Sequence, residues 1–277
     1  MQNQPYALEE RSYIIQFQHP EKILAGMPGM SDALVAMLHN IDLVTYQTIK
    51  THFDDNARNA AMDLLSDPAF AAQVDRLPFV AGEIIVGLGD SITDDYQSWL
   101  EILRHLLALR RPQDNLTVIN AGISGDTTAN LISRFLDVIH AKPDWIFCFV
   151  GTNDARLHGE SPSKTLLSLS ETAANLSMLR HYAAKQTQAE WVWLTPATVL
   201  EDWIGVDWFL GPLQLGWRNS DLAAIAELMR TLPDPVVDLQ AVFGTPANPD
   251  YLLPDGLHPS LAGQKSIVTA LIERLVA

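Results

Sequence analysis

Five apolar runs alternate with amphipathic stretches from residue 83 onward, and this alternation constrains the fold more than any other feature. The runs have strand length and span residues 84–88, 116–119, 145–150, 191–195 and 236–239. Near-continuous hydrophobicity is typical of strands buried on both faces, as in a parallel sheet covered by helices. The stretches between them, such as SWLEILRHLLALRR, carry apolar residues at helical spacing. We therefore predict an α/β fold with right-handed crossovers.

Helical patterns occupy the chain before residue 80. Residues 31–53 indicate one helix with Ser31 as its N-cap, and residues 54–77 indicate two shorter helices broken at 66–68. Residues 19–30 are rich in Pro and Gly and predict a loop. We divide the chain into a helical N-terminal region, 1–80, and an α/β domain, 81–277. The N-terminal region can be a dimerisation element, a cap over the site or a docking domain.

The composition is that of a large soluble domain. The 277 residues are 48% hydrophobic, with a formal net charge of −15. An acidic surface disfavours nucleic acid and anionic membranes, which need a basic footprint. The start of the chain lacks the pattern of a secretory signal, and no apolar run approaches the roughly 20 residues of a membrane span. We expect a cytoplasmic protein with no integral membrane segment.

Cys148 is the sole cysteine, so no intrachain disulfide can form. It lies within the apolar run WIFCFV, which predicts a small buried hydrophobic residue there.

Polar segments follow four of the five apolar runs. They are GDS at 89–91, NAGISGDTT at 120–128, GTNDAR at 151–156 and PDGLHPS at 254–260. In open parallel sheets, ligands bind beyond the carboxyl ends of the strands. The four segments should therefore meet at one edge of the sheet.

Ser91 is a candidate nucleophile at the turn after the first run. A serine hydroxyl needs a neighbouring base, usually a histidine oriented by a carboxylate. His258 is the natural base, and Asp255 lies three residues before it in the same loop. Each feature has a plainer interpretation, because Ser91 can cap a helix and PDGLHP can be a polar turn.

Gly125 and Asn153 are candidate oxyanion-hole donors. A glycine lets a backbone N–H approach a substrate oxygen, and the asparagine amide supplies a second donor. The N–H of Ser91 would be a third. Taken separately, SGD and TND are ordinary loop sequences.

Together the four segments resemble the GDSL esterases and lipases, also called SGNH hydrolases. GDS matches their block I, NAGISGDT block II, GTND block III and DGLHP block V, in the right order. The resemblance implies Ser91 as nucleophile, His258 as general base and Asp255 as the group that orients the histidine. It also implies an oxyanion hole made by Ser91 N–H, Gly125 N–H and the Asn153 amide.

The resemblance covers roughly residues 83–277 and implies a three-layer α/β/α fold with a five-stranded, parallel, flavodoxin-like sheet. It implies no metal and no cofactor. Ile92 replaces the leucine of block I, a conservative change. Residues 1–82 have no counterpart in the family core.

Residues 195–217 form a long apolar segment after the fourth run. It should lie over the same rim as Ser91, either packed on itself or as an aromatic wall for an acyl chain or a sugar. Trp203 and Trp208 are the candidate substrate-binding residues.

Asp94 and Asp95 could suggest paired glycosidase carboxylates, but we expect them to favour the first turn of the next helix through its dipole.

We therefore predict a serine esterase that hydrolyses carboxylic esters through a covalent acyl-enzyme. Lipids, short acyl esters and O-acetylated carbohydrates all remain open as substrates. An acyltransferase using the same site and a catalytically silent binding module are the alternatives. A homo-oligomer could form through the N-terminal helices. With an unperturbed histidine pKa near 6.5, activity should fall in mild acid.

Overall fold

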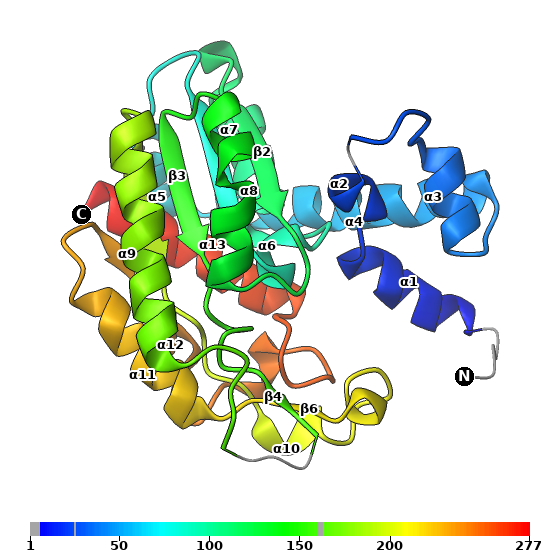
Figure 1. Cartoon of the computed structure of the whole chain (residues 1–277). Coiled ribbons are helices and arrows are strands. Elements are labelled where there is room, and N and C mark those ends of the chain that lie inside the picture. The colour runs from blue at the N-terminus through cyan, green and yellow to red at the C-terminus, as the bar shows by residue number, and fades with distance from the viewer. Residues whose placement is uncertain (1–5, 25, 160–162) are drawn as a thin grey trace.

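The computed structural model describes residues 6–24, 26–159 and 163–277. Its centre is a five-stranded parallel sheet in the order β2-β1-β3-β5-β7 (Figure 1). The strands are β1 (Ile84–Gly89), β2 (Thr117–Gly122), β3 (Trp145–Phe149), β5 (Glu190–Leu194) and β7 (Val236–Val237). This order confirms the predicted α/β, flavodoxin-like fold.

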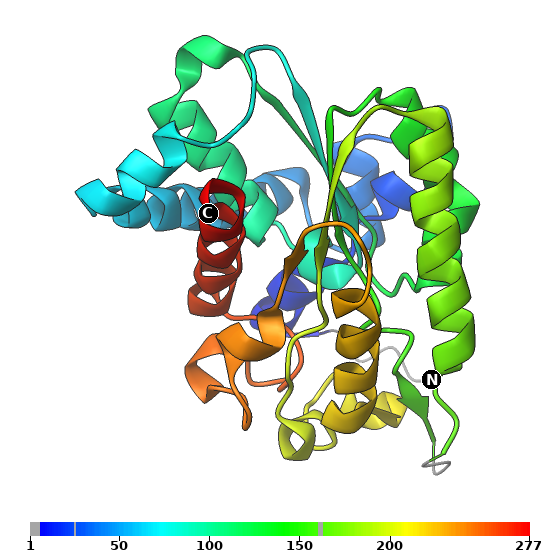
Figure 2. The same cartoon turned by 90° about the vertical axis from the view of Figure 1, so that its left-hand side faces the viewer.

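Alternate side chains of each strand enter two different cores, because successive residues point to opposite faces of a sheet. On β1, Ile85 belongs to one core and Val86 to the other. The first core is closed by α7 (Trp99–Arg110) and α13 (Leu261–Val276), and the second by α8 (Thr128–His140), α9 (Leu169–Gln186) and α11 (Asn219–Arg230). Figure 2 shows these two helical layers on either side of the sheet. Cys148 is fully buried in the second core, as predicted.

Two strands, β2 and β7, end more than one residue away from the predicted end. β2 continues through Asn120 to Gly122, because β1 offers it hydrogen-bonding partners up to the pair Gly89 and Gly122. The last strand stops at Val237, since Asp238 caps α12 (Leu239–Phe243) by accepting the N–H of Gln240 at 3.1 Å. Leu239 was predicted to end the strand, but in the structure it begins α12.

Short elements complete the domain. They are α6 (Ser91–Asp94), α10 (Glu201–Ile204), the 3₁₀ turns η1 (Pro112–Asp114), η2 (Gly211–Leu213) and η3 (Pro249–Tyr251), and an antiparallel ribbon of β4 (Leu157–His158) and β6 (Leu215–Gly216). In the part of the chain that the structure describes, no helix has the length and apolar character needed to cross a bilayer.

The N-terminal region contains α1 (Leu8–Phe17), α2 (Pro20–Ile23), α3 (Asp32–Leu38), α4 (Leu43–Leu65) and α5 (Pro68–Asp75). The single helix predicted over 31–53 is wrong: Ser31 caps α3, but Asn40 adopts a left-handed φ of 54° and Asp42 caps a new helix. The predicted loop at 19–30 contains α2, which starts at a proline suited to a first helical turn.

α4 and α5 pack into the first core of the α/β domain. Ala57 and Ala61 of α4 and Phe70 and Val74 of α5 are buried in the same cluster as Leu103 of α7. The sequence pattern changes near residue 80, but the packing is continuous there. α1, α3 and the start of α4 form a smaller cluster to one side, centred on Ile15, Val35, Ala36 and Tyr46 (Figure 1).

Truncating Phe70 tests this shared core. Phe70→Ala should lower the free energy of unfolding by about 3 kcal/mol, because it leaves a cavity between α5 and the core. Val80→Ala is the control: Val80 is 64% exposed, and its truncation should change stability by less than about 0.5 kcal/mol. Denaturant unfolding measures both. Equal, small effects would show that α5 does not belong to the core.

Candidate active site

Ser91 stands on a tight turn at the carboxyl end of β1. The strand ends at Gly89, and Asp90 caps the single turn α6 by accepting the N–H of Ile92 at 3.1 Å. A side chain at Gly89 would meet the carbonyl oxygen of Phe149 at 2.5 Å, so only glycine fits this close approach. The stretch SWLEILRHLLALRR forms the long helix α7, which begins at Trp99 and is capped by Ser98.

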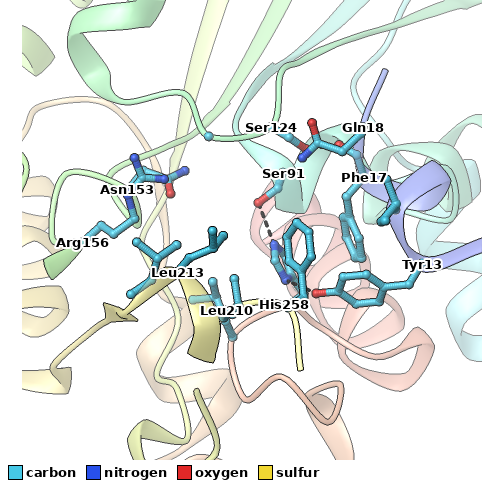
Figure 3. Close-up of a pocket in the computed structure, with 15 residues that line it drawn as sticks. Tyr13, Phe17, Gln18, Ser91, Ser124, Asn153, Arg156, Leu210, Leu213 and His258 are labelled. Carbon is cyan, nitrogen blue, oxygen red and sulfur yellow. Dashed lines mark hydrogen bonds between the residues drawn. The ribbon is translucent and has the colours of Figure 1, made fainter. Parts of the chain in front are cut away.

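His258 and Asp255 reach Ser91 from the loop before α13. The Ser91 Oγ lies 2.9 Å from His258 Nε2 (Figure 3). On the other side of the ring, His258 Nδ1 lies 2.7 Å from Asp255 Oδ2. Asp255 Oδ1 accepts the backbone N–H groups of Leu257 and His258 at 2.8 and 2.9 Å. Gly256 has a φ of +71°, which allows the loop to turn back on itself. The three side chains form a continuous hydrogen-bonded chain.

The predicted oxyanion-hole groups line the same pocket as Ser91 and His258. Asn153 Nδ2 donates to the carbonyl of Asp126 at 3.1 Å, which fixes the amide and leaves its second hydrogen for another acceptor. Gly125 has a φ of +86° and open space where a side chain would be. The backbone N–H groups of Ser91 and Gly125 donate to no other group in residues 6–24, 26–159 and 163–277.

Hydrogen bonds hold the loops after β2 and β3 together. The buried Asp154 accepts the N–H and the hydroxyl of Thr128, at 3.0 and 2.5 Å, and the hydroxyl of Thr172 at 3.0 Å. Arg134 donates to Asp126 at 2.6 Å and to the carbonyl of Gly89 at 3.2 Å. The donors that converge on the pocket therefore belong to one connected framework.

Buried carboxylates surround the histidine. Burial lowers the pKa of His258, but the charge of Asp255 and its hydrogen bond outweigh burial, and the pKa lies above its usual value. Asp90 and Asp95 contribute in the same direction. Burial raises the pKa of Asp90 and of Asp95 to about 7.

Asp94 lies in the first turn of the short helix α6, whereas Asp95 is the C-cap of that helix and not a first-turn residue. Both side chains are buried. Asp94 Oδ1 lies 2.6 Å from His19 Nδ1 and 2.5 Å from Lys22 Nζ, and its Oδ2 accepts the N–H of Ser124 at 2.9 Å. Asp94 therefore holds the residue next to Gly125 in place.

The pocket above Ser91 has a volume of about 180 Å³ and a largely apolar wall. Its polar lining includes Gln18, Ser124 and Arg156. Its apolar and aromatic lining consists of Tyr13, Ile14, Phe17, Phe209, Leu210, Leu213, Leu215 and Leu257. In Figure 3, Tyr13 and Phe17 lie on one side of His258, and Asn153 and Arg156 lie on the opposite side.

Trp203 and Trp208 do not line this pocket. They are 39% and 40% exposed, and Trp208 packs edge-on against Tyr13 from outside, with ring centroids 5.5 Å apart. The segment after β5 does supply a wall, but through Phe209 and the leucines that follow it. The predicted segment therefore lines the pocket through residues other than the two tryptophans.

The α1 residues were missed altogether. Tyr13, Ile14, Phe17 and Gln18 lie near the start of the chain, where no family motif occurs. The spacing of Tyr13 and Phe17, four residues apart, places two aromatic rings on one helical face and was the one available signal.

Comparison with known proteins places this site in a family. The model of the GDSL-like lipase/acylhydrolase family matches residues 88–265. An arylesterase from Vibrio mimicus is 30% identical over 207 residues, covering 71% of this chain and 90% of the relative. An acetylxylan esterase from Geobacillus stearothermophilus is 34% identical over 89 residues, 27% of this chain and 41% of the relative.

Solved structures agree in fold. A single-substitution variant of Axe2, an acetyl-xylooligosaccharide esterase from Geobacillus, superposes with a TM-score of 0.57 at 25% identity, covering 71% of this chain and 95% of that one. The chain belongs to the GDSL-like lipase/acylhydrolase family and is a carboxylic ester hydrolase.

Within the described ranges, no group of three or more His, Cys, Asp or Glu side chains is arranged to hold a metal ion.

The raised pKa of His258 predicts the pH dependence of activity. A histidine that accepts the Ser91 proton must be neutral, so activity is lost as the pH falls through the pKa of His258. Because Asp255 raises that pKa above about 6.5, the acidic limb of kcat/KM should lie above this value. Initial rates with p-nitrophenyl acetate from about pH 5 to about pH 9 locate the limb.

Asp255→Asn is the matched variant for this measurement. It removes the charge that raises the pKa of His258, so its residual activity should show an acidic limb at lower pH than the wild type. An unmoved limb would contradict the assignment of that limb to His258.

Proposed function

We propose that Ser91 is the nucleophile, His258 the general base and Asp255 the group that orients it. The observation that carries this proposal is the 2.9 Å contact between Ser91 Oγ and His258 Nε2 at the floor of a small apolar pocket. The Asp255 carboxylate accepts the Nδ1 proton of His258, which leaves Nε2 free to take the serine proton. The direction of the hydrogen bonds thus suits a serine hydrolase.

In the first half-reaction, Ser91 Oγ attacks the ester carbonyl carbon as its proton passes to His258 Nε2. The negative charge on the carbonyl oxygen is stabilised by the N–H groups of Ser91 and Gly125 and by the free amide hydrogen of Asn153. The tetrahedral intermediate then expels the alcohol, which takes the proton from His258. Water repeats the sequence on the acyl-enzyme, releases the acid and restores Ser91.

The substrate we propose is an ester of a short acyl group with an apolar or aromatic alcohol. The pocket of about 180 Å³ is smaller than the roughly 300–1,000 Å³ of typical ligand sites. Its wall is mostly Phe, Tyr, Leu and Ile side chains, which suit apolar groups better than a hydroxyl-rich sugar. The relative named as an acetylxylan esterase supports a short acyl group, and the relative named as an arylesterase supports an aromatic alcohol.

Ser91→Ala tests the nucleophile. The variant should lose at least about 10³-fold in kcat for p-nitrophenyl acetate, because no acyl-enzyme can form. Its melting temperature should stay within a few degrees of the wild type, since only one partly buried hydroxyl is lost. Turnover at the wild-type rate would exclude Ser91 as the nucleophile.

The size of the pocket predicts chain-length selectivity. With p-nitrophenyl acetate, butyrate and octanoate, kcat/KM should be highest for the two short esters and fall by at least about tenfold for octanoate. Leu210→Ala removes a buried wall residue and should reduce this difference. Val206→Ala is the control from the same segment, since Val206 is 84% exposed and does not line the pocket. A preference for octanoate in the wild type would contradict the proposal.

A further inference from the structure

Helix α1 lies outside the region matched by the family, yet it lines the pocket. The family model begins at residue 88, and α1 ends at Phe17. Tyr13 and Phe17 of α1 nevertheless face the cavity that contains Ser91 and His258 (Figure 3), and Ile14 also lines it. The contribution of α1 to the site is therefore a property of this chain and not of the matched family core.

The hydroxyl of Tyr13 contacts the Asp255–His258 pair directly. It donates to Asp255 Oδ2 at 2.5 Å and lies 3.4 Å from His258 Nδ1. Burial, followed by the charge of Asp255, raises the pKa of Tyr13 far above its usual range, so the phenol stays protonated and acts as a donor. Asp255 Oδ2 thus accepts two hydrogen bonds, one from His258 and one from Tyr13.

Together these contacts satisfy the whole Asp255 carboxylate. Its Oδ1 accepts two backbone N–H groups from its own loop, and its Oδ2 accepts the histidine and the tyrosine. The donors approach from two separate elements, the loop before α13 and helix α1. The tyrosine therefore limits rotation of the carboxylate and, through it, tilting of the imidazole.

Phe17 packs against the ring of the same histidine. Its ring centroid lies 4.3 Å from that of His258, with an angle of 31° between the planes. Tyr13 and Phe17 contact one another at 5.2 Å. Both rings lie against the imidazole and leave Nε2 directed at Ser91.

Polar contacts hold α1 in this position. Gln16 Nε2 donates to Asp95 Oδ1 at 3.0 Å, and the carbonyl of Phe17 accepts the hydroxyl of Ser124. Directly after α1, His19 contacts the buried Asp94 at 2.6 Å. The same helix is thus anchored to the turn that carries Ser91 and to the loop that carries Gly125.

We propose that α1 completes the active site and that Tyr13 is a positioning residue for the Asp255–His258 pair. This inference rests on the serine hydrolase mechanism proposed above. The Tyr13 hydroxyl restrains the Asp255 carboxylate. By donating to Oδ2, it also weakens the attraction between that oxygen and the protonated ring of His258. Removing this hydroxyl should therefore loosen the histidine and also raise the pKa of His258, because Asp255 Oδ2 then interacts more strongly with the protonated ring.

The test is Tyr13→Phe in the full chain, with Tyr6→Phe as the matched control. Both changes remove one hydroxyl from the same segment, and Tyr6 is 51% exposed and does not line the pocket. For Tyr13→Phe we expect kcat for p-nitrophenyl acetate to fall about tenfold with KM within about twofold, as for loss of a hydrogen bond to a charged group. The acidic limb of kcat/KM should move to higher pH.

The charged groups facing His258 are Asp255 on its own loop and Asp90 and Asp95 on the turn after β1. None of them is altered in either variant, so a shift of the acidic limb confined to Tyr13→Phe isolates the tyrosine. If Tyr13→Phe matches Tyr6→Phe in kcat and in its acidic limb, Tyr13 is not a positioning residue. A fall in kcat with an unmoved limb and a lowered melting temperature would assign it a purely structural role and overturn the inference.

Fluorophosphonate labelling separates failure of this inference from failure of the proposed function. The reagent needs the Ser91–His258 pair but no ester substrate. Absence of labelling in the wild type would overturn the proposed mechanism itself. Labelling of the wild type and of Tyr13→Phe at the same rate at every pH would overturn only the role of Tyr13. We expect the wild type to be labelled and Tyr13→Phe to be labelled more slowly.

Discussion

The parallel pairing of β1 with β2 and β3 determines where the catalytic groups lie. Gly89 is in register with Gly122 on one side and with Phe149 on the other, so the three strands end at the same level. The turns that leave them must then share a small volume. A side chain at Gly122 would lie 2.4 Å from the backbone nitrogen of Asp94, which shows how closely the turns approach. The nucleophile and the predicted oxyanion donors are neighbours because of this register.

The parts of the fold and of the site that could be predicted are those with a local sequence pattern. Strand positions, strand order and the polar turns are local patterns or follow from one family resemblance, and Ser91, His258, Asp255, Gly125 and Asn153 all lie on such turns. The exact strand ends depend on pairing with neighbours, so β2 and β7 differed from the expectation. The gap between α3 and α4 depends on the backbone of Asn40 and the cap at Asp42, which periodicity does not reveal.

The rest of the pocket depends on tertiary contacts with no local signal. Tyr13 contacts Asp255 only because α1 is anchored through Gln16 and His19 to buried carboxylates on the turn after β1. Trp203 and Trp208 are prominent in the sequence, but packing turns Phe209 and Leu210 toward the cavity in their place. A homo-oligomer through the N-terminal helices and a cytoplasmic location stay predictions.

The contact between Tyr13 and Asp255 joins residues 242 positions apart. Contacts of such large sequence separation carry a loop-closure cost and form late in folding, after nearer segments have collapsed. The two cores beside the sheet contain no residue of α1, whereas the pocket needs α1 and the loop before α13 to meet. Ester hydrolysis therefore serves as a sensor of α1 docking, because it reports whether the start of the chain has met a loop near its end.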